Sequence, residues 1–133
     1  MIQQWCNMKF YEDDRIQSLH DIFPIKEGQI NISIARNTNN VVAWHKHEIQ
    51  KDYWCCIKGS FKVGIVDNGK VYWKYLSDKD FQALSIFPGQ YHGYRALEPN
   101  SIMLYYLDQK YDKNDEFKKP PGYFGEIWES ENK

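Results

Sequence analysis

Three histidines and one aspartate are the residues of this chain best suited to chemistry. His45 and His47 stand two positions apart, so both imidazoles face the same side of an extended segment. Asp52 begins the next expected strand, and His92 lies downstream on a strand that would neighbour the first in a rolled-up barrel. Three imidazoles and one carboxylate are therefore expected to converge on a single site.

Two kinds of chemistry fit such a set. Mixed imidazole and carboxylate ligands suit Zn, Fe, Mn or Ni, and the ligands would then be His45, His47, Asp52 and His92. Without a metal, an imidazole with an ordinary pKa of about 6.5 accepts protons at neutral pH. The residues alone leave both possibilities open.

Short strands must position these side chains. From Gln29 to Ala35 the isoleucines at 30, 32 and 34 alternate with polar residues, which is the period-two pattern of a half-buried strand. Similar units, separated by turn-forming clusters such as Asp67-Asn68-Gly69, are expected at Val41–Trp44, Tyr53–Ile57, Ser60–Val66, Lys70–Tyr75, Phe81–Phe87, Tyr91–Leu97 and Ile102–Leu107. This spacing predicts an all-β fold, either a sandwich or a barrel.

The chain is expected to form one domain over residues 1–133. Residues 108–133 form a tail, rich in charge at first and apolar at its end, that is predicted to pack back on the barrel. Near the other end, Asp14 to Phe23 is expected to form a short helical or extended arm.

Composition excludes several classes of function. A formal net charge of -1 leaves no basic surplus for a phosphate backbone, so nucleic acid is not an expected partner. No apolar run reaches the roughly 18 residues of a membrane span, and Met1 to Asp14 lacks the apolar core of a signal peptide. The odd number of cysteines, three, argues against a disulfide framework, and a cytoplasmic location is predicted.

The histidine spacing resembles the two-part motif of the cupin superfamily, and this resemblance implies that the all-β fold is an antiparallel jelly-roll barrel. The segment from Trp44 to Gly59 matches the first part, which is H-x-H followed by an acidic residue and a glycine. The segment from Pro88 to Gly93 matches the second part, G-x-x-H. The acidic residue of the superfamily is usually Glu, and Asp52 is one methylene shorter.

A closer resemblance extends over most of the chain. The matching segments are Asp14-Arg15 with Ser18-Leu19, Asn31 with Ser33, Gln50 with Gly59 and Asp67, Phe87 to Tyr94, and Leu104-Tyr105-Tyr106 with Tyr111. Together they are similar to the motifs of the cupin-fold nucleotide-sugar epimerases typified by dTDP-4-dehydrorhamnose 3,5-epimerase.

That resemblance implies an isomerase acting on a nucleotide-diphosphate-linked 4-keto-6-deoxy sugar, as an epimerase or ketoisomerase, with no cofactor and as a homodimer. His45 would be the general base and Tyr105 the acid. The implied substrate-binding residues are Asn31, His47, Gln50, Asp52, His92 and Arg95. Asp67 would hold a histidine in the useful tautomer, or would only begin the Asp67-Asn68-Gly69 turn, and Glu126 is a candidate substitute for the acidic partner of the histidine.

Two departures keep other readings open. Asp52 stands where the epimerases have a lysine, and Val42 stands where they have an arginine, for which Arg36 or Arg95 would compensate. A developing enolate needs a donor or a positive charge, which a carboxylate does not supply unless it is protonated or metal-bound. The alternatives are therefore a metal-dependent cupin enzyme with a His/His/Asp/His site and a non-catalytic sugar-binding cupin.

Overall fold

The computed structural model describes residues 4–129. Residues 1–3 and 130–133, at the two ends of the expected domain and tail, lie outside the described residues. The elements are β1 (Lys9–Glu12), β2 (Gln17–His20), β3 (Gln29–Ala35), β4 (Val41–Lys46), β5 (Asp52–Lys58), β6 (Ser60–Asp67), β7 (Lys70–Ser77), β8 (Ala83–Ile86), β9 (Tyr91–Ala96), β10 (Ser101–Leu107), the 3₁₀ turn η1 (Lys113–Asp115) and β11 (Phe117–Lys118).

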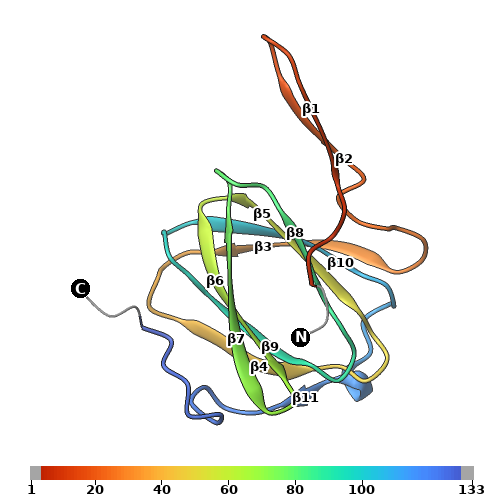
Figure 1. Cartoon of the computed structure of the whole chain (residues 1–133). Coiled ribbons are helices and arrows are strands. Elements are labelled where there is room, and N and C mark those ends of the chain that lie inside the picture. The colour runs from red at the N-terminus through yellow and green to blue at the C-terminus, as the bar shows by residue number, and fades with distance from the viewer. Residues whose placement is uncertain (1–3, 130–133) are drawn as a thin grey trace.

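Two antiparallel sheets face each other and form the body of the molecule (Figure 1). The first sheet has the strand order β3-β10-β5-β8 and the second the order β11-β4-β9-β6-β7. Every pairing between these strands within residues 4–129 is antiparallel. The predicted all-β antiparallel barrel is confirmed.

Local sequence accounts for the turns and the strand limits. Strand β3 has the predicted bounds, and β6 and β7 meet at a two-residue turn in which Asn68 and Gly69 have φ of 52° and 74°. Positive φ at both positions is the requirement of a type I′ hairpin, which Asn-Gly meets at low cost. The predicted N-terminal arm is extended, because β1 and β2 pair as a hairpin that projects from the barrel (Figure 1).

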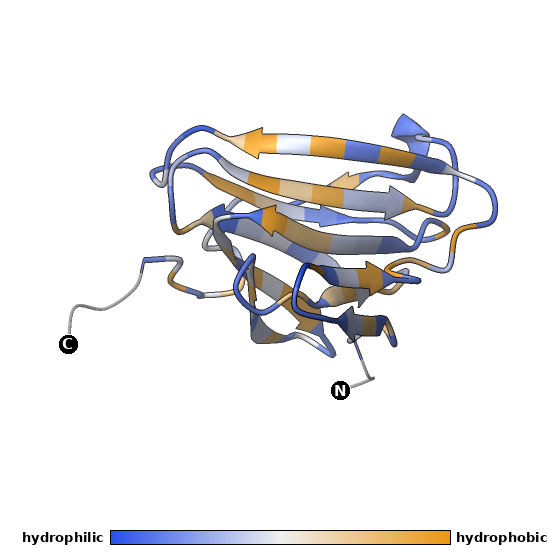
Figure 2. Cartoon of the chain, turned by 90° about the horizontal axis from the view of Figure 1, so that it is seen from above, coloured by the Kyte–Doolittle hydropathy of each residue, from blue (hydrophilic) through white to orange (hydrophobic). Residues whose placement is uncertain are grey.

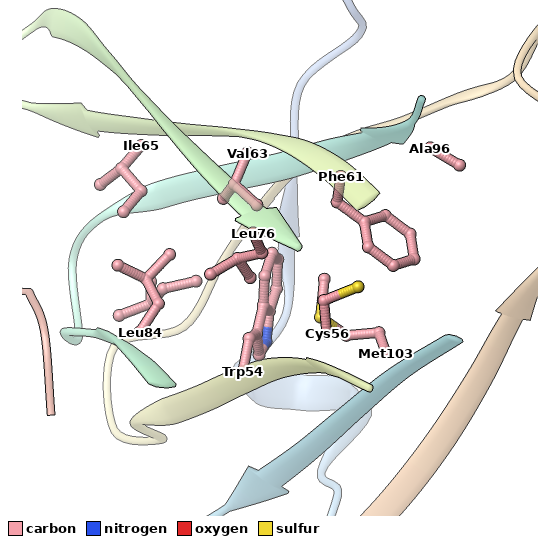
Figure 3. Packing of buried hydrophobic residues seen from close by; sticks show 10 residues of the cluster. Trp54, Cys56, Phe61, Val63, Ile65, Leu76, Leu84, Ala96 and Met103 are labelled. Carbon is pink, nitrogen blue, oxygen red and sulfur yellow. The ribbon is translucent and has the colours of Figure 1, made fainter. Parts of the chain in front are cut away.

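The core lies between the two sheets. Figure 2 shows hydrophobic and hydrophilic residues mixed along the strands of both sheets. Buried apolar residues of β5 to β10 meet between the sheets, whereas the isoleucines of β3 are 53 to 59% exposed. Trp54, Phe61, Leu76 and Met103 are among the buried members of this core (Figure 3). The core fills one part of the space between the sheets, and polar side chains line the rest.

The described part of the tail runs along the second sheet. Strand β11 pairs with β4, which places it at the edge of that sheet. Farther on, Trp128 is buried, with its ring 5.1 Å from that of Trp44 and 4.9 Å from that of Trp73. The tail therefore adds a strand and an aromatic cover to the barrel. None of the helical structure in residues 4–129 is long or apolar enough to cross a membrane.

Candidate functional site

A cavity of about 230 Å³ lies between the two sheets. All but one of the predicted site residues line it: Asn31, His45, His47, Gln50, Asp52, His92 and Tyr105. They come from both sheets, because β3, β5 and β10 contribute from one side and β4 and β9 from the other. The barrel thus brings together residues that are far apart in the sequence.

A register shift in β4 sets the position of His45. The pairing of β4 with β9 shifts between Val42 and His45, and His45 then stands directly opposite His92. Residues opposite each other in an antiparallel ladder project to the same face, so both imidazoles point to the cavity. His47 follows β4 and completes the group, with its ring centroid 5.4 Å from that of His92.

Glu116 is the acidic partner of His45. Its Oε1 lies 3.1 Å from Nδ1 of His45, and its Oε2 accepts a hydrogen bond of 3.0 Å from the Tyr111 hydroxyl. Burial opposes the charge on Glu116, but Tyr111, the Lys118 ammonium and His45 hold its pKa below the ordinary value. A carboxylate at Nδ1 directs the Nδ1 proton toward itself and leaves Nε2 with a lone pair.

The sequence does not predict Glu116 as this partner, and the positions that it suggested were Asp67 and Glu126. Asp67 pairs with Lys70 at the β6–β7 turn, and the Glu126 carboxylate accepts hydrogen bonds from Trp128 and from the backbone of Gly122 and Phe124. The acidic group comes instead from the charge-rich segment after Tyr111, which was predicted only to pack on the barrel. Only the matched Tyr111, five residues before Glu116, indicated that this segment reaches the site.

Asp115 holds the loop that carries His47. Its carboxylate accepts hydrogen bonds from the backbone N–H groups of Glu48, Ile49 and Gln50, at 2.8 to 3.2 Å, and its own carbonyl lies 2.6 Å from Nδ1 of His47. Burial opposes its charge, yet these three donors hold its pKa below the ordinary value. A carbonyl oxygen only accepts, so His47 donates from Nδ1 and presents Nε2 elsewhere.

Asp52 and His92 form the buried end of the site. Burial, and then the neighbouring His47, lowers the pKa of His92 to about 3, and its Nδ1 lies 3.1 Å from the Gln90 carbonyl. Its Nε2 is 3.7 Å from Oδ2 of Asp52. Because a neutral His92 donates from Nδ1 to that carbonyl, Nε2 and a carboxylate oxygen face each other as two acceptors.

Burial also raises the pKa of Asp52. A 2.6 Å hydrogen bond from Gln50 to Oδ1 favours the charged carboxylate and offsets part of this rise. Two arrangements satisfy the facing acceptors: a proton on Asp52 or a cation between the two groups. His47, Asp52 and His92 each offer a ligand atom, and these atoms lie within 4.8 Å of one another. His45, the fourth ligand predicted for a metal, is bonded to Glu116 instead and does not belong to this group.

Tyr105 lines the cavity from the first sheet. It pairs with Asn31 on β3 and with Trp54 on β5, and its hydroxyl is 2.9 Å from Oγ of Ser33. The phenol therefore lies on the sheet opposite the one that carries His45.

Arg95 is the predicted site residue that the structure does not bring to the cavity. Its guanidinium donates to the carbonyls of Thr38 and Trp128 at 2.7 and 3.2 Å. The sequence suggested it as a replacement for a missing arginine, but these bonds tie the tail to the barrel. Among the residues that the structure describes, no lysine or arginine lines the cavity.

A family model described as FdtA, WxcM-like, C-terminal matches residues 23–127, which is most of the chain. The chain belongs to this WxcM-like family. No curated protein matches the sequence.

Solved structures similar to this WxcM-like chain include two kinds of sugar-nucleotide enzyme. A 3′-monoepimerase from Streptomyces bikiniensis, ChmJ, solved with dTDP-quinovose, has a TM-score of 0.81 and 18% identity over 93% of this chain and 73% of its own. The rmlC epimerase of Mycobacterium tuberculosis has a TM-score of 0.78 and 19% identity, with 93% and 72% covered. QdtA from Thermoanaerobacterium thermosaccharolyticum, a sugar 3,4-ketoisomerase solved with TDP, has a TM-score of 0.77 and 16% identity, with 94% and 95% covered.

At these identities the likeness establishes the fold. The predicted resemblance to nucleotide-sugar epimerases is confirmed at that level, and ketoisomerases share the same fold.

Proposed function

We propose that this protein is an isomerase that moves a proton next to the ketone of a nucleotide-diphosphate-linked 4-keto-6-deoxy sugar, as an epimerase or a ketoisomerase. The observation that carries the proposal is the pairing of His45 with Glu116 in a cavity that Tyr105 lines from the opposite sheet. The similar solved structures, an epimerase with dTDP-quinovose and a ketoisomerase with TDP, support the same class of substrate.

His45 would act as the general base. With Nδ1 directed to Glu116, its Nε2 takes the proton from the carbon next to the ketone, and the electron pair of that C–H bond passes into an enolate. The Glu116 carboxylate then stabilises the imidazolium that forms. This first step is shared by epimerisation and ketoisomerisation.

Tyr105 would return a proton. A phenol carries its proton at neutral pH and can donate it. Return to the opposite face of the same carbon inverts it, which is epimerisation. Return to the former carbonyl carbon moves the ketone, which is ketoisomerisation. In that case the hydroxyl on the deprotonated carbon passes its proton to the former ketone oxygen. Asn31, Gln50 and the buried imidazoles would hold the sugar between the two groups.

A metal-dependent enzyme is a second candidate, favoured by the cluster of His47, Asp52 and His92. Both histidines direct Nδ1 to a backbone carbonyl, which is the arrangement that orients Nε2 toward a metal. The residues therefore fit a divalent transition metal such as Zn²⁺. When bound, the ion would polarise the ketone as a Lewis acid, while His45 and Tyr105 would keep their proposed roles.

Solvent exchange tests both candidates. The protein, with its metal content measured, is incubated in D₂O with dTDP-linked 4-keto-6-deoxyhexoses, and deuterium is located by NMR. Exchange at C3 or C5 by metal-free protein supports the first candidate, and exchange only after Zn²⁺ is added supports the second. Failure to exchange while the sugar nucleotide still binds overturns both and leaves a non-catalytic sugar-binding cupin.

A homodimer is part of the proposal. On the outer face of the first sheet, the chain's own Cys6, Met8 and Phe23 pack over β5 and β8, but the isoleucines of β3 are 53 to 59% exposed. The β1–β2 hairpin carries further exposed apolar residues, Phe10 and Tyr11. A second copy of the chain would cover the exposed isoleucines of β3, and by symmetry the first copy would cover those of the second.

The oligomeric state tests this pairing. Ile32→Lys is expected to convert a dimer to a monomer in sedimentation analysis, whereas the control Ile127→Lys, at an exposed isoleucine of the tail, leaves the dimer intact. A wild-type monomer contradicts the pairing. The cytoplasmic location stays a prediction, and the free thiols of Cys6, Cys55 and Cys56 agree with a reducing compartment.

A further inference from the structure

The cavity has no place for a diphosphate. Within residues 4–129, its charged lining consists of Asp52 and Glu116 besides the histidines, with no lysine or arginine. Burying phosphate charges beside carboxylates is costly, so the diphosphate of a nucleotide sugar must lie at the rim while the sugar enters. The rim is on the side of the C-terminal segment, where Tyr111 is 56% exposed.

Lys118 stands at this rim. It pairs directly with His45 in the β4–β11 ladder, so its side chain projects to the same face of the sheet as the His45 imidazole. Glu116, two residues before it in extended chain, also faces that side and bonds to His45. Strand β11 is an edge strand, and Lys118 is exposed there to solvent.

The Lys118 ammonium has no close polar partner among the described residues. Within residues 4–129 it makes no hydrogen bond and no ion pair within 4.0 Å, whereas Lys46 pairs with Glu48 at 2.8 Å. Lys119, the next residue, lies with its ammonium 4.7 Å from the ring centre of Tyr123. The charge of Lys118 is nevertheless felt at the site, because it helps to lower the pKa of Glu116.

We propose that Lys118 binds the diphosphate of the nucleotide sugar at the rim of the cavity. This inference rests on the proposed function and adds the contact that directs the sugar inward toward His45. It also explains how the chain dispenses with the arginine that Val42 replaces. A lysine supplies a point charge to phosphate and does not need the two-pronged geometry of arginine.

Calorimetric titration with dTDP tests the inference on the full chain. Lys118→Gln is expected to weaken dTDP binding about three- to tenfold, as loss of one solvent-exposed charged contact does. Lys118→Arg keeps the affinity. Lys119→Gln removes the same charge one residue along, on the opposite face of the strand, and is expected to bind like the wild type. Added salt should weaken the wild type more than Lys118→Gln.

The outcomes separate the two proposals. Equal dTDP affinity of the wild type and Lys118→Gln, with matching thermal unfolding, overturns the role of Lys118 and leaves the proposed function standing. A wild type that binds none of dTDP, UDP and GDP overturns the proposed function, and the diphosphate contact with it. In turnover, the expected signature of Lys118→Gln is a raised KM with kcat unchanged.

Discussion

The two ends of the cavity use the same residue types in opposite electrostatic states. At the rim, His45 bonds to the Glu116 carboxylate, which Tyr111 and Lys118 help to keep charged. At the buried end, His92 is held neutral by burial, and burial also disfavours the charge on its carboxylate neighbour Asp52. A histidine beside an acid is therefore not by itself a base, because solvent and further donors decide whether the pair holds charge.

This difference assigns distinct work to the two pairs. The rim pair can take up a proton, since a positive imidazolium gains a charged partner there. The buried pair resists ionisation and is suited to hydrogen bonding with an uncharged part of a sugar. Substitutions at the two ends should accordingly differ in their effect on turnover.

His45→Asn is expected to have the largest effect. Removal of a general base lowers kcat about 10²- to 10⁴-fold, with little change in thermal unfolding because the residue is at the rim. Steady-state turnover and deuterium exchange measure it, with His20→Asn on the projecting hairpin as the control. Exchange that persists in His45→Asn would mean that another group is the base.

Glu116→Gln is expected to lower kcat about tenfold, because the amide still accepts the Nδ1 proton but no longer balances the imidazolium. It also alters the pH dependence of stability. A carboxyl whose folded pKa is lowered stabilises the protein above its unfolded pKa, near 4.5, and loses that contribution as pH falls through the folded pKa.

Urea unfolding of both proteins at pH 7 and pH 3 measures this second effect. The free energy of unfolding of the wild type should fall further over that range than that of Glu116→Gln, by about 1 kcal/mol. Identical falls would mean that the carboxylate of Glu116 gains nothing from its partners in the folded state.

The strands and the histidines could be predicted because their signals are local. Period-two alternation gave β3 its limits, and Asn68-Gly69 marked the β6–β7 turn. The two histidine motifs then pointed to His45, His47 and His92, which lie on β4, in the loop after β4 and on β9, and which line one cavity. Each of these predictions needed only a few consecutive residues and the rules of strand geometry.

The partners of those histidines could not be predicted, because they depend on where the tail lies. Glu116 and Asp115 reach the site because β11 pairs with β4, and a two-residue strand has no periodic signal. Arg95 was assigned to substrate for its charge, but the tail's Trp128 carbonyl takes its guanidinium. The tail thus supplied two residues that were not expected, Glu116 and Asp115, and bound the guanidinium of Arg95, which had been expected at the site.

Asp52→Asn is expected to have the smallest effect and to test the buried end directly. Asparagine is the same size, its Oδ1 still accepts the bond from Gln50, and its amide N–H can point to Nε2 of His92, so the facing acceptors are satisfied. In a metal-free enzyme kcat should stay within about threefold, the cost of exchanging one hydrogen bond for another. Turnover and bound metal are measured together on both proteins. A large fall in kcat with loss of a metal that the wild type retains would make the buried end a metal centre, because only a metal needs the charge of Asp52 where His92 is neutral.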